Sequence, residues 1–330
     1  MKTEDEFLYD LENGTDTRSK NEVADTPDNF KKWIIDNKDR IAKAEERGTL
    51  PYFIKENKNF VSISDKSFSL GSIKETAVQD AINSIKDISK ITDNEIVDIL
   101  MSFAKDNTDW FDGELKGVHF MKNSEGFMSM ERQYRLGAGD RIFDKGNALY
   151  ITDKNIDGFN PLAEFKGALN AIKEGKNLTF KQEYAVECVW HEFLHGKATG
   201  WSNINNKTDK LFNSMEVANQ FCARRSYIPF LESLGGKSLH AEQIMAKGIG
   251  YRNELDNFNL MIDTLKIDKS KLYDFLSDKV INTKYEDIFD EMTRYISKET
   301  GIGKRKINEL IENLNIADFR FEKRLSKTTK

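Results

Sequence analysis

The sequence predicts an α+β protein that is mostly helical and contains a small antiparallel sheet. Three observations support this fold class. Apolar side chains recur at helical spacing over much of the chain, and only four prolines interrupt it. Between about residues 110 and 152, short apolar runs instead alternate with glycine-containing turns, which is typical of short strands. Helical periodicity returns from Pro161 onward, so strands and helices occupy separate stretches of the chain.

The composition predicts a soluble globular protein. Of the 330 residues, 38% are hydrophobic and 32% are charged, a balance that suits a folded chain with a real core. We find no apolar run long enough to span a bilayer and no signal peptide, so we expect a cytoplasmic protein. Two cysteines give no disulfide framework. The net charge of −5 does not favour nucleic acid, and we expect neither nucleic acid nor a membrane as a partner.

We expect four regions along the chain. They are a flexible acidic lead-in over 1–26, a helical region over 27–109, a core over 110–235 and a helical region with a basic tail over 236–330. Residues 301–330 carry eight basic and four acidic side chains, which we interpret as a solvated surface.

Capping signals and periodicity predict the individual elements. A helix should begin at Pro27, and the other predicted helices are 72–90, 93–106, 161–174, 179–197, 212–234, 238–247, 252–265, 284–298 and 303–314. The predicted strands contain Val118–Met121, Phe127–Met130 and Ala148–Ile151.

The segment HEFLH at 191–195 carries the clearest chemical signal. Thr179 and Gln182 form a capping-box pattern at the start of the helix that contains it. Histidines four residues apart lie on one helical face, so His191 and His195 can reach one metal ion. Glu192 lies beside the first of them, where a carboxylate can take a proton from a metal-bound water.

A catalytic zinc needs a third protein ligand and one open position. Twenty residues separate His195 from Glu216, which we expect on the next helix as the third ligand. His240 is the competing candidate. Asn213 and Gln220 flank Glu216 at helical spacing and are candidates for hydrogen bonds that orient the ligands.

This segment resembles the gluzincin group of zincin metallopeptidases, in which HExxH is followed some twenty residues later by a ligand glutamate. The resemblance implies that His191, His195 and Glu216 bind Zn²⁺. It also implies that Glu192 is the catalytic base and activates a zinc-bound water for attack on a peptide carbonyl. Those families place an edge strand beside the cleft, and Asn147–Tyr150 looks like that strand. The HExxH helix would then pack against the sheet in a zincin-like core.

Such an enzyme also needs a donor that stabilises the transition state, and Tyr227, Tyr251 and His240 are the candidates. The expected function is therefore a zinc metallopeptidase acting on a protein or peptide. Two alternatives remain: a phage or mobile-element structural or assembly protein with a vestigial or structural zinc site, and hydrolysis of an amide in a small molecule. The first alternative rests partly on Lys197, which stands where the extended motif expects an apolar residue.

A second resemblance concerns the N-terminal region. The segments 30–33, 40–41 and 47–54 look like parts of phage head-morphogenesis proteins and of polyvalent proteins of mobile elements. This resemblance implies phage particle components as partners and a virion-associated location.

Two further patterns have ordinary interpretations. Asp153–Gly158 with Glu164 matches a calcium-loop template in its letters, but Asn160 and the proline after it predict a turn followed by a helix N-terminus. Arg224 and Arg225 are interpreted as an exposed pair on a helix.

Overall fold

The structure is a computed structural model that describes residues 81–82, 85, 91–107, 114–122, 126–136, 142–201 and 207–328. The predicted acidic lead-in, the helix expected from Pro27 and the phage-like segments lie outside these residues. The chain divides into two compact units, one of residues 71–238 and 247–330 and the other of residues 1–70 and 239–246. Only 239–246 of the second unit is described, and it forms most of helix α11 (Ala241–Lys247).

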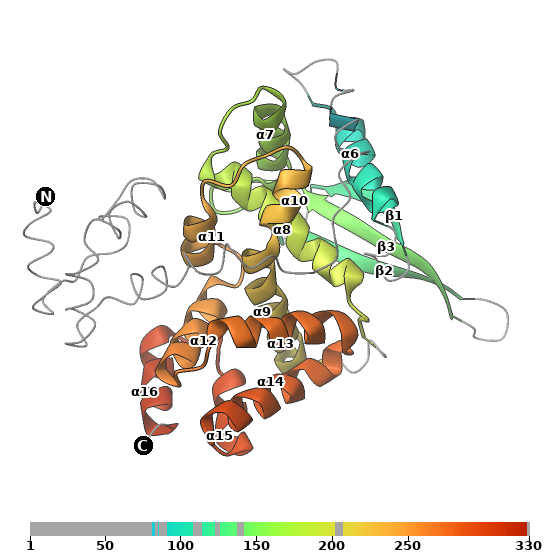
Figure 1. Ribbon diagram of the computed structural model, residues 1–330. Helices are drawn as coiled ribbons and strands as arrows, with labels where there is room; N and C mark the ends of the chain where they lie inside the picture. Colours follow the sequence, from blue (N-terminus) through green and yellow to red (C-terminus); the bar gives the residue numbers. More distant parts are fainter. Residues whose placement is uncertain are drawn as a thin grey trace, which may run out of the picture. The chain divides into compact units, whose positions relative to one another are not determined.

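The first unit has the predicted α+β class, with helices far outnumbering strands (Figure 1). Its sheet contains β1 (Leu115–Met121), β2 (Met128–Leu136) and β3 (Ile142–Thr152), in the spatial order β1-β3-β2. Among the apolar strand side chains whose burial is described, Ala148, Leu149 and Ile151 of β3 are the ones fully covered.

The prediction of a purely antiparallel sheet was wrong for one strand pair. β2 and β3 are antiparallel, with Met130 opposite Leu149, but β1 and β3 run parallel, with Val118 opposite Leu149. β2 follows β1 in the sequence but does not pair with it, and β3 lies between the two in the sheet. The position of β3 is explained by its apolar sequence, since a central strand is covered by neighbours on both edges.

The central place of β3 also corrects the prediction about a substrate-binding edge strand. Asn147 pairs with Leu115 on one side and with Arg132 on the other, so the segment 147–150 has no free edge. The edge strands of this sheet are β1 and β2.

Helix α8 (Phe180–Lys197) lies at the centre of the unit, against β2 on one side and α9 (Asp209–Ser226) on another (Figure 1). The predicted capping box starts it: the Gln182 amide donates to Thr179 Oγ1, and the Thr179 amide donates to Gln182 Oε1. Most of its side chains are buried, including Trp190 and Phe193. A helix buried on nearly every side holds polar groups in fixed positions, because they cannot move without disturbing the core.

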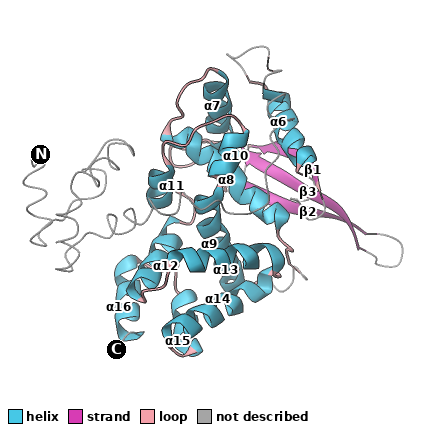
Figure 2. Cartoon of the chain, in the orientation of Figure 1, coloured by secondary structure: helices cyan, strands magenta, loops and turns pink. Residues whose placement is uncertain are grey.

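Two more helices border the sheet, as the secondary-structure view shows (Figure 2). α6 (Asp93–Asp106) has the predicted bounds and contacts β1, while α7 (Pro161–Lys173) contacts β3 and α8. Asn160 caps α7 by accepting a hydrogen bond from the Ala163 amide. The segment before it is a turn in which Asn155 accepts from the Gly158 amide, in agreement with the interpretation of this segment as a turn.

The predicted helix 212–234 is broken into α9 and α10 (Ile228–Ser233). Pro229 lies in the first turn of α10 and has no amide hydrogen to donate to the carbonyl of Arg225, so the first helix ends at Ser226. A proline in an apolar helical pattern therefore marked a boundary that periodicity alone did not reveal.

The helical C-terminal part contains two helices that were not predicted from the sequence, α13 (Lys269–Asn282) and α16 (Asp318–Thr328). The remaining helices are α12 (Arg252–Thr264), α14 (Tyr285–Thr300) and α15 (Lys304–Ile311). α12, α13 and α14 contact α9, whereas α16 contacts α12 and α15. Among the described residues, no helix has both the length and the apolarity to cross a membrane.

Candidate metal centre

Two helices bring three ligand atoms together. Nε2 of His191 and Nε2 of His195, one turn apart on α8, are 3.0 Å from each other. Each nitrogen is 3.2 Å from Oε2 of Glu216 on α9. Tetrahedral ligands about 2.0–2.1 Å from one zinc ion are separated by roughly 3.3 Å, so these spacings fit a single ion. The three side chains are a group that could hold a metal, and the predicted competitor His240 is not part of it.

Burial and charge set the protonation of the group. Burial raises the pKa of Glu216, but the two histidines outweigh this effect and hold that pKa well below its usual value. Burial lowers the pKa of His191, yet the hydrogen bond to Glu216 and the nearby carboxylates raise it overall. The site therefore holds a carboxylate in its charged form, which a divalent cation would neutralise.

The second ring nitrogen of His195 has a defined partner. Its Nδ1 lies 2.8 Å from the Tyr285 hydroxyl, and that hydroxyl donates to the His195 carbonyl oxygen at 3.3 Å. Because the hydroxyl proton is used on the carbonyl, Nδ1 is the donor to the hydroxyl oxygen. Nε2 then keeps its lone pair, which is the form a metal ligand requires.

The second ring nitrogen of His191 has no such partner. Its Nδ1 is buried and forms no hydrogen bond with the described residues. Glu187 lies one turn earlier on α8 and is fully buried. Its Oε1 accepts from Gln220 at 2.5 Å, while its Oε2 is also unpartnered among the described residues. Burial raises the pKa of Glu187 to about 7.

Polar side chains of α9 fix its register against α8. Asn219 Nδ2 donates to the His191 carbonyl oxygen at 3.0 Å, and Gln220 binds Glu187. The predicted role of Gln220 in orienting the ligands stays a prediction, because its hydrogen bond goes to Glu187 rather than to one of the three ligands. These two contacts lie one turn beyond Glu216 and hold its carboxylate opposite the histidines.

Glu192 is 7% exposed, and its Oε1 lies 3.9 Å from His191 Nε2. Burial raises the pKa of Glu192, whereas electrostatic interactions with the two nearby histidines and a hydrogen bond from the backbone amide of Met130 on β2 lower it. Glu192 therefore lies between the metal-binding group and an edge strand of the sheet.

Tyr251 is a second phenol beside this group, on the side of His191. Its ring stacks on His191 with 6.0 Å between centroids, and its hydroxyl interacts with Glu216. Burial and the charges of Glu216 and Glu192 raise its pKa, so the hydroxyl stays protonated. The residue has φ 51°, a left-handed conformation that is unusual for a bulky side chain.

The turn before Tyr251 is held by two buried side chains. The Arg224 guanidinium of α9 donates to the carbonyl oxygens of Gly248 and Gly250, each at 2.9 Å. The Gly250 amide donates to the Tyr184 hydroxyl at 2.7 Å. Arg224 is 3% exposed, so the interpretation of it as an exposed helix residue was wrong. These contacts impose the strained backbone that places Tyr251 over His191.

The other predicted donors lie elsewhere. Tyr227 is fully buried, and its hydroxyl donates to Glu183 at 2.5 Å, away from the metal-binding group. His240 belongs to the second compact unit, where its Nδ1 lies 2.9 Å from Gln243. Cys188 is a buried free thiol whose burial raises its pKa.

Three supporting residues, Glu187, Arg224 and Tyr285, were not predicted from the sequence. Glu187 carried a weak signal, since it lies four residues before His191 and so on the same helical face. Tyr285 is 90 residues from the histidine it contacts, and no local pattern links them.

The donor set suits a borderline-soft divalent cation, since imidazole nitrogens and one carboxylate are the ligands that zinc takes in open sites. Comparison of the chain with protein-family models, with curated proteins and with solved structures finds no match.

Proposed function

We propose that this protein is a zinc-dependent peptidase. The observation that carries the proposal is the convergence of His191, His195 and Glu216 beside the carboxylate of Glu192. This arrangement agrees with the resemblance of the motif and its spacing to gluzincin metallopeptidases. Three protein ligands leave a fourth coordination position for substrate or solvent, as an open catalytic site requires.

When bound, zinc would lower the pKa of water toward neutrality and polarise a substrate carbonyl. Glu192 accepts the proton of the attacking water and then delivers it to the leaving amine. Its raised pKa suits this work, because a base that must later act as an acid is most effective with a pKa near the working pH.

We assign Tyr251 as the donor to the oxygen on which negative charge develops. Its protonated hydroxyl points into the group that holds the metal, whereas the hydroxyl of Tyr227 is engaged in the core. A donor fixed by a strained backbone needs little rearrangement during the reaction, and such groups contribute most when they are held in place beforehand.

The edge strand β2 supports a binding mode for the substrate. The Met130 amide faces Glu192, so this part of the strand borders the proposed site. β2 pairs with β3 on one side only. An extended peptide can add to such an edge through main-chain hydrogen bonds, which would place its carbonyl beside Glu192.

The test combines metal analysis with a digest of a peptide library read by mass spectrometry. The wild-type protein should carry about one zinc per chain, and His191→Ala should lose it. Glu192→Gln should keep the metal and lower the cleavage rate by about 10²–10⁴-fold. Equal cleavage by the wild type and Glu192→Gln would refute the proposal.

A structural or assembly role for the same site is the second candidate. It is favoured by the burial of the ligands, since His191 is 5% and Glu216 is 6% exposed. Under this alternative, zinc removal lowers the melting temperature, and the library remains uncut by the metal-loaded wild type.

A further inference from the structure

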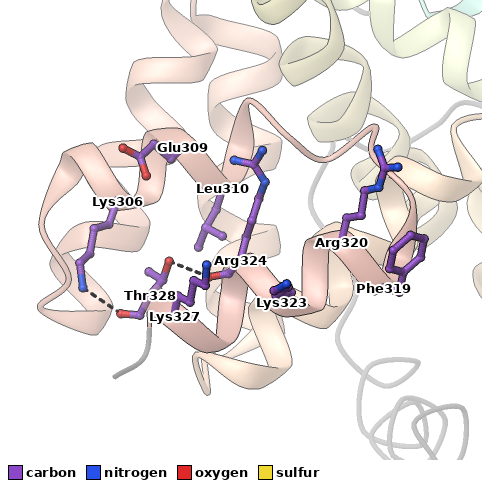
Figure 3. A pocket seen from close by; sticks show the side chains of 9 residues that line it. All are labelled: Lys306, Glu309, Leu310, Phe319, Arg320, Lys323, Arg324, Lys327 and Thr328. Carbon is purple, nitrogen blue, oxygen red and sulfur yellow. Dashed lines mark hydrogen bonds between the residues drawn. The ribbon is translucent and has the colours of Figure 1, made fainter.

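A cavity lies between α15 and α16, outside the candidate metal centre. Its volume is about 660 Å³. It is lined by Lys306, Glu309, Leu310, Phe319, Arg320, Lys323, Arg324, Lys327 and Thr328 (Figure 3). Five of these nine side chains are cationic and one is acidic, so the cavity is suited to an anion.

The cations form one continuous face. Arg320, Lys323, Arg324 and Lys327 are spaced three, four and seven residues apart from the first, so they lie on one side of α16. Lys306 comes from α15, and its Nζ donates to the Thr328 carbonyl oxygen. All five are exposed, and none forms an ion pair with a carboxylate of the described residues. On the opposite side, Phe321 and Leu325 are buried and anchor the helix.

An aromatic ring lies beside this face. Phe319 is 68% exposed and is the one large hydrophobic side chain of the described residues that is exposed. The Arg320 guanidinium lies 5.6 Å from its ring centroid, and Figure 3 shows the two side by side at one end of the cavity. An exposed ring next to a cationic groove is the arrangement with which proteins bind single strands, because bases stack on the ring while cations hold the phosphates.

We propose that the α15–α16 cavity binds a single-stranded nucleic acid. The five cations hold successive phosphates, and Phe319 stacks on a base. The Glu309 carboxylate accepts a hydrogen bond from a base amino group. An acidic peptide is a poorer match, because Phe319 would lack a flat partner. A bilayer is also a poorer match, because a flat surface does not enter a cavity.

This proposal departs from the expectation drawn from net charge. The chain carries −5 overall, but phosphate binding depends on the local concentration of positive charge. The sequence shows the excess of basic residues in 301–330. The structure adds that five of them line one concave surface beside an exposed ring.

The test measures fluorescence anisotropy of a labelled oligothymidine of roughly 12 nucleotides with the full-length protein. We expect saturable binding at low salt. A plot of the logarithm of the binding constant against the logarithm of the salt concentration should be linear. Its slope should be no steeper than about −3.5, the value expected when five phosphates are neutralised. Lys323→Glu with Arg324→Glu should weaken binding at least about 10-fold and reduce the slope by about 1.4 or more.

Further variants test the contribution of the Phe319 ring and serve as controls. Phe319→Ala should weaken binding about 5- to 150-fold, whereas Phe319→Tyr should retain it. Lys271→Glu with Lys298→Glu removes two exposed lysines of α13 and α14 outside the cavity and should leave binding unchanged. Glu192→Gln should also bind as the wild type does, which separates this result from the peptidase proposal. Circular dichroism checks that each variant is folded.

Three results would overturn the proposal: no saturable binding at low salt, binding that the α16 double variant retains, or a preference for polyglutamate or for anionic vesicles over the oligonucleotide. The last result would reassign the surface to an acidic protein or to a membrane.

Discussion

At the scale of single residues, the two histidines of the candidate metal centre differ in what contacts their second ring nitrogen. His195 Nδ1 is bound to Tyr285, but His191 Nδ1 is buried without a partner among the described residues. A histidine that binds a metal generally donates its other N–H to an oxygen. Oε2 of Glu187 is the unpartnered oxygen on the same helical face, so we expect it to orient His191 when the metal is bound.

Replacing Glu187 with glutamine should therefore weaken zinc binding by about 10- to 100-fold. The measurement is competition with a zinc-binding dye above pH 7, where Glu187 is ionised. Glu183→Gln is the matched control, because Glu183 is equally buried on α8 but binds Tyr227 and Ser238 instead. Equal zinc affinity of the Glu187 variant and the wild type would show that Glu187 does not orient the ligand.

The assignment of Tyr251 makes a second prediction. Tyr251→Phe removes the donor and should lower kcat by about 10²–10³-fold, with zinc content unchanged. Tyr227→Phe removes a phenol of the core and should lower stability while leaving kcat near that of the wild type. If the two variants lost activity in the opposite order, the donor would be Tyr227.

At the scale of elements, the turn between α11 and α12 is tightly packed against Arg224. A methyl group at Gly248 would lie 2.6 Å from the Arg224 guanidinium, so an alanine there displaces the side chain that holds the turn. Arg224 is buried, and few alternative positions are open to it.

Gly248→Ala should therefore lower stability by about 1–3 kcal/mol and lower kcat more than it lowers zinc content. Urea unfolding and the cleavage assay measure the two effects. Gly303→Ala is the control, since the added methyl group meets no atom within 4 Å. Should both glycine variants behave like the wild type, Arg224 would have room to move and the turn would not be rigid.

At the scale of the whole molecule, the buried Glu187 links folding to pH. Its pKa is raised from 4.5 to about 7 in the folded chain. Between these values the unfolded chain binds fewer protons than the folded chain, so the free energy of unfolding falls as pH rises. The contribution of protonated Glu187 is fully present below pH 4.5 and is lost as pH rises through about 7.

In the metal-free protein, Glu187→Gln should flatten this dependence, because the amide does not ionise. We expect the wild type to lose on the order of 2–3 kcal/mol relative to the variant between pH 5 and pH 8. Urea unfolding in the presence of a chelator measures it. Parallel curves for the two proteins would mean that Glu187 ionises as easily when folded as when unfolded.

Much of the helical framework and of the metal-binding group followed from local sequence. The bounds of α6, the capping box of α8 and the grouping of His191, His195 and Glu216 could all be predicted from patterns of residue type and spacing. Each depends on contacts within a few residues, or on a motif whose two parts lie on consecutive helices. The residues that interact are close together in the sequence, so the local pattern of residue types is enough to specify these interactions.

The strand order, the position of Tyr251 over His191 and the contacts around the candidate site were decided only by tertiary structure. β3 lies between β1 and β2 because its apolar residues are best covered in the centre of the sheet. Which strand takes the central position depends on all three strands, so the alternation of residues within one strand does not predict it. The contacts that hold Tyr285, Arg224 and Tyr251 at the site join residues that lie 24 to 90 positions apart in the sequence. Contacts of that separation depend on how helices pack together, and the same local sequence is compatible with many packings.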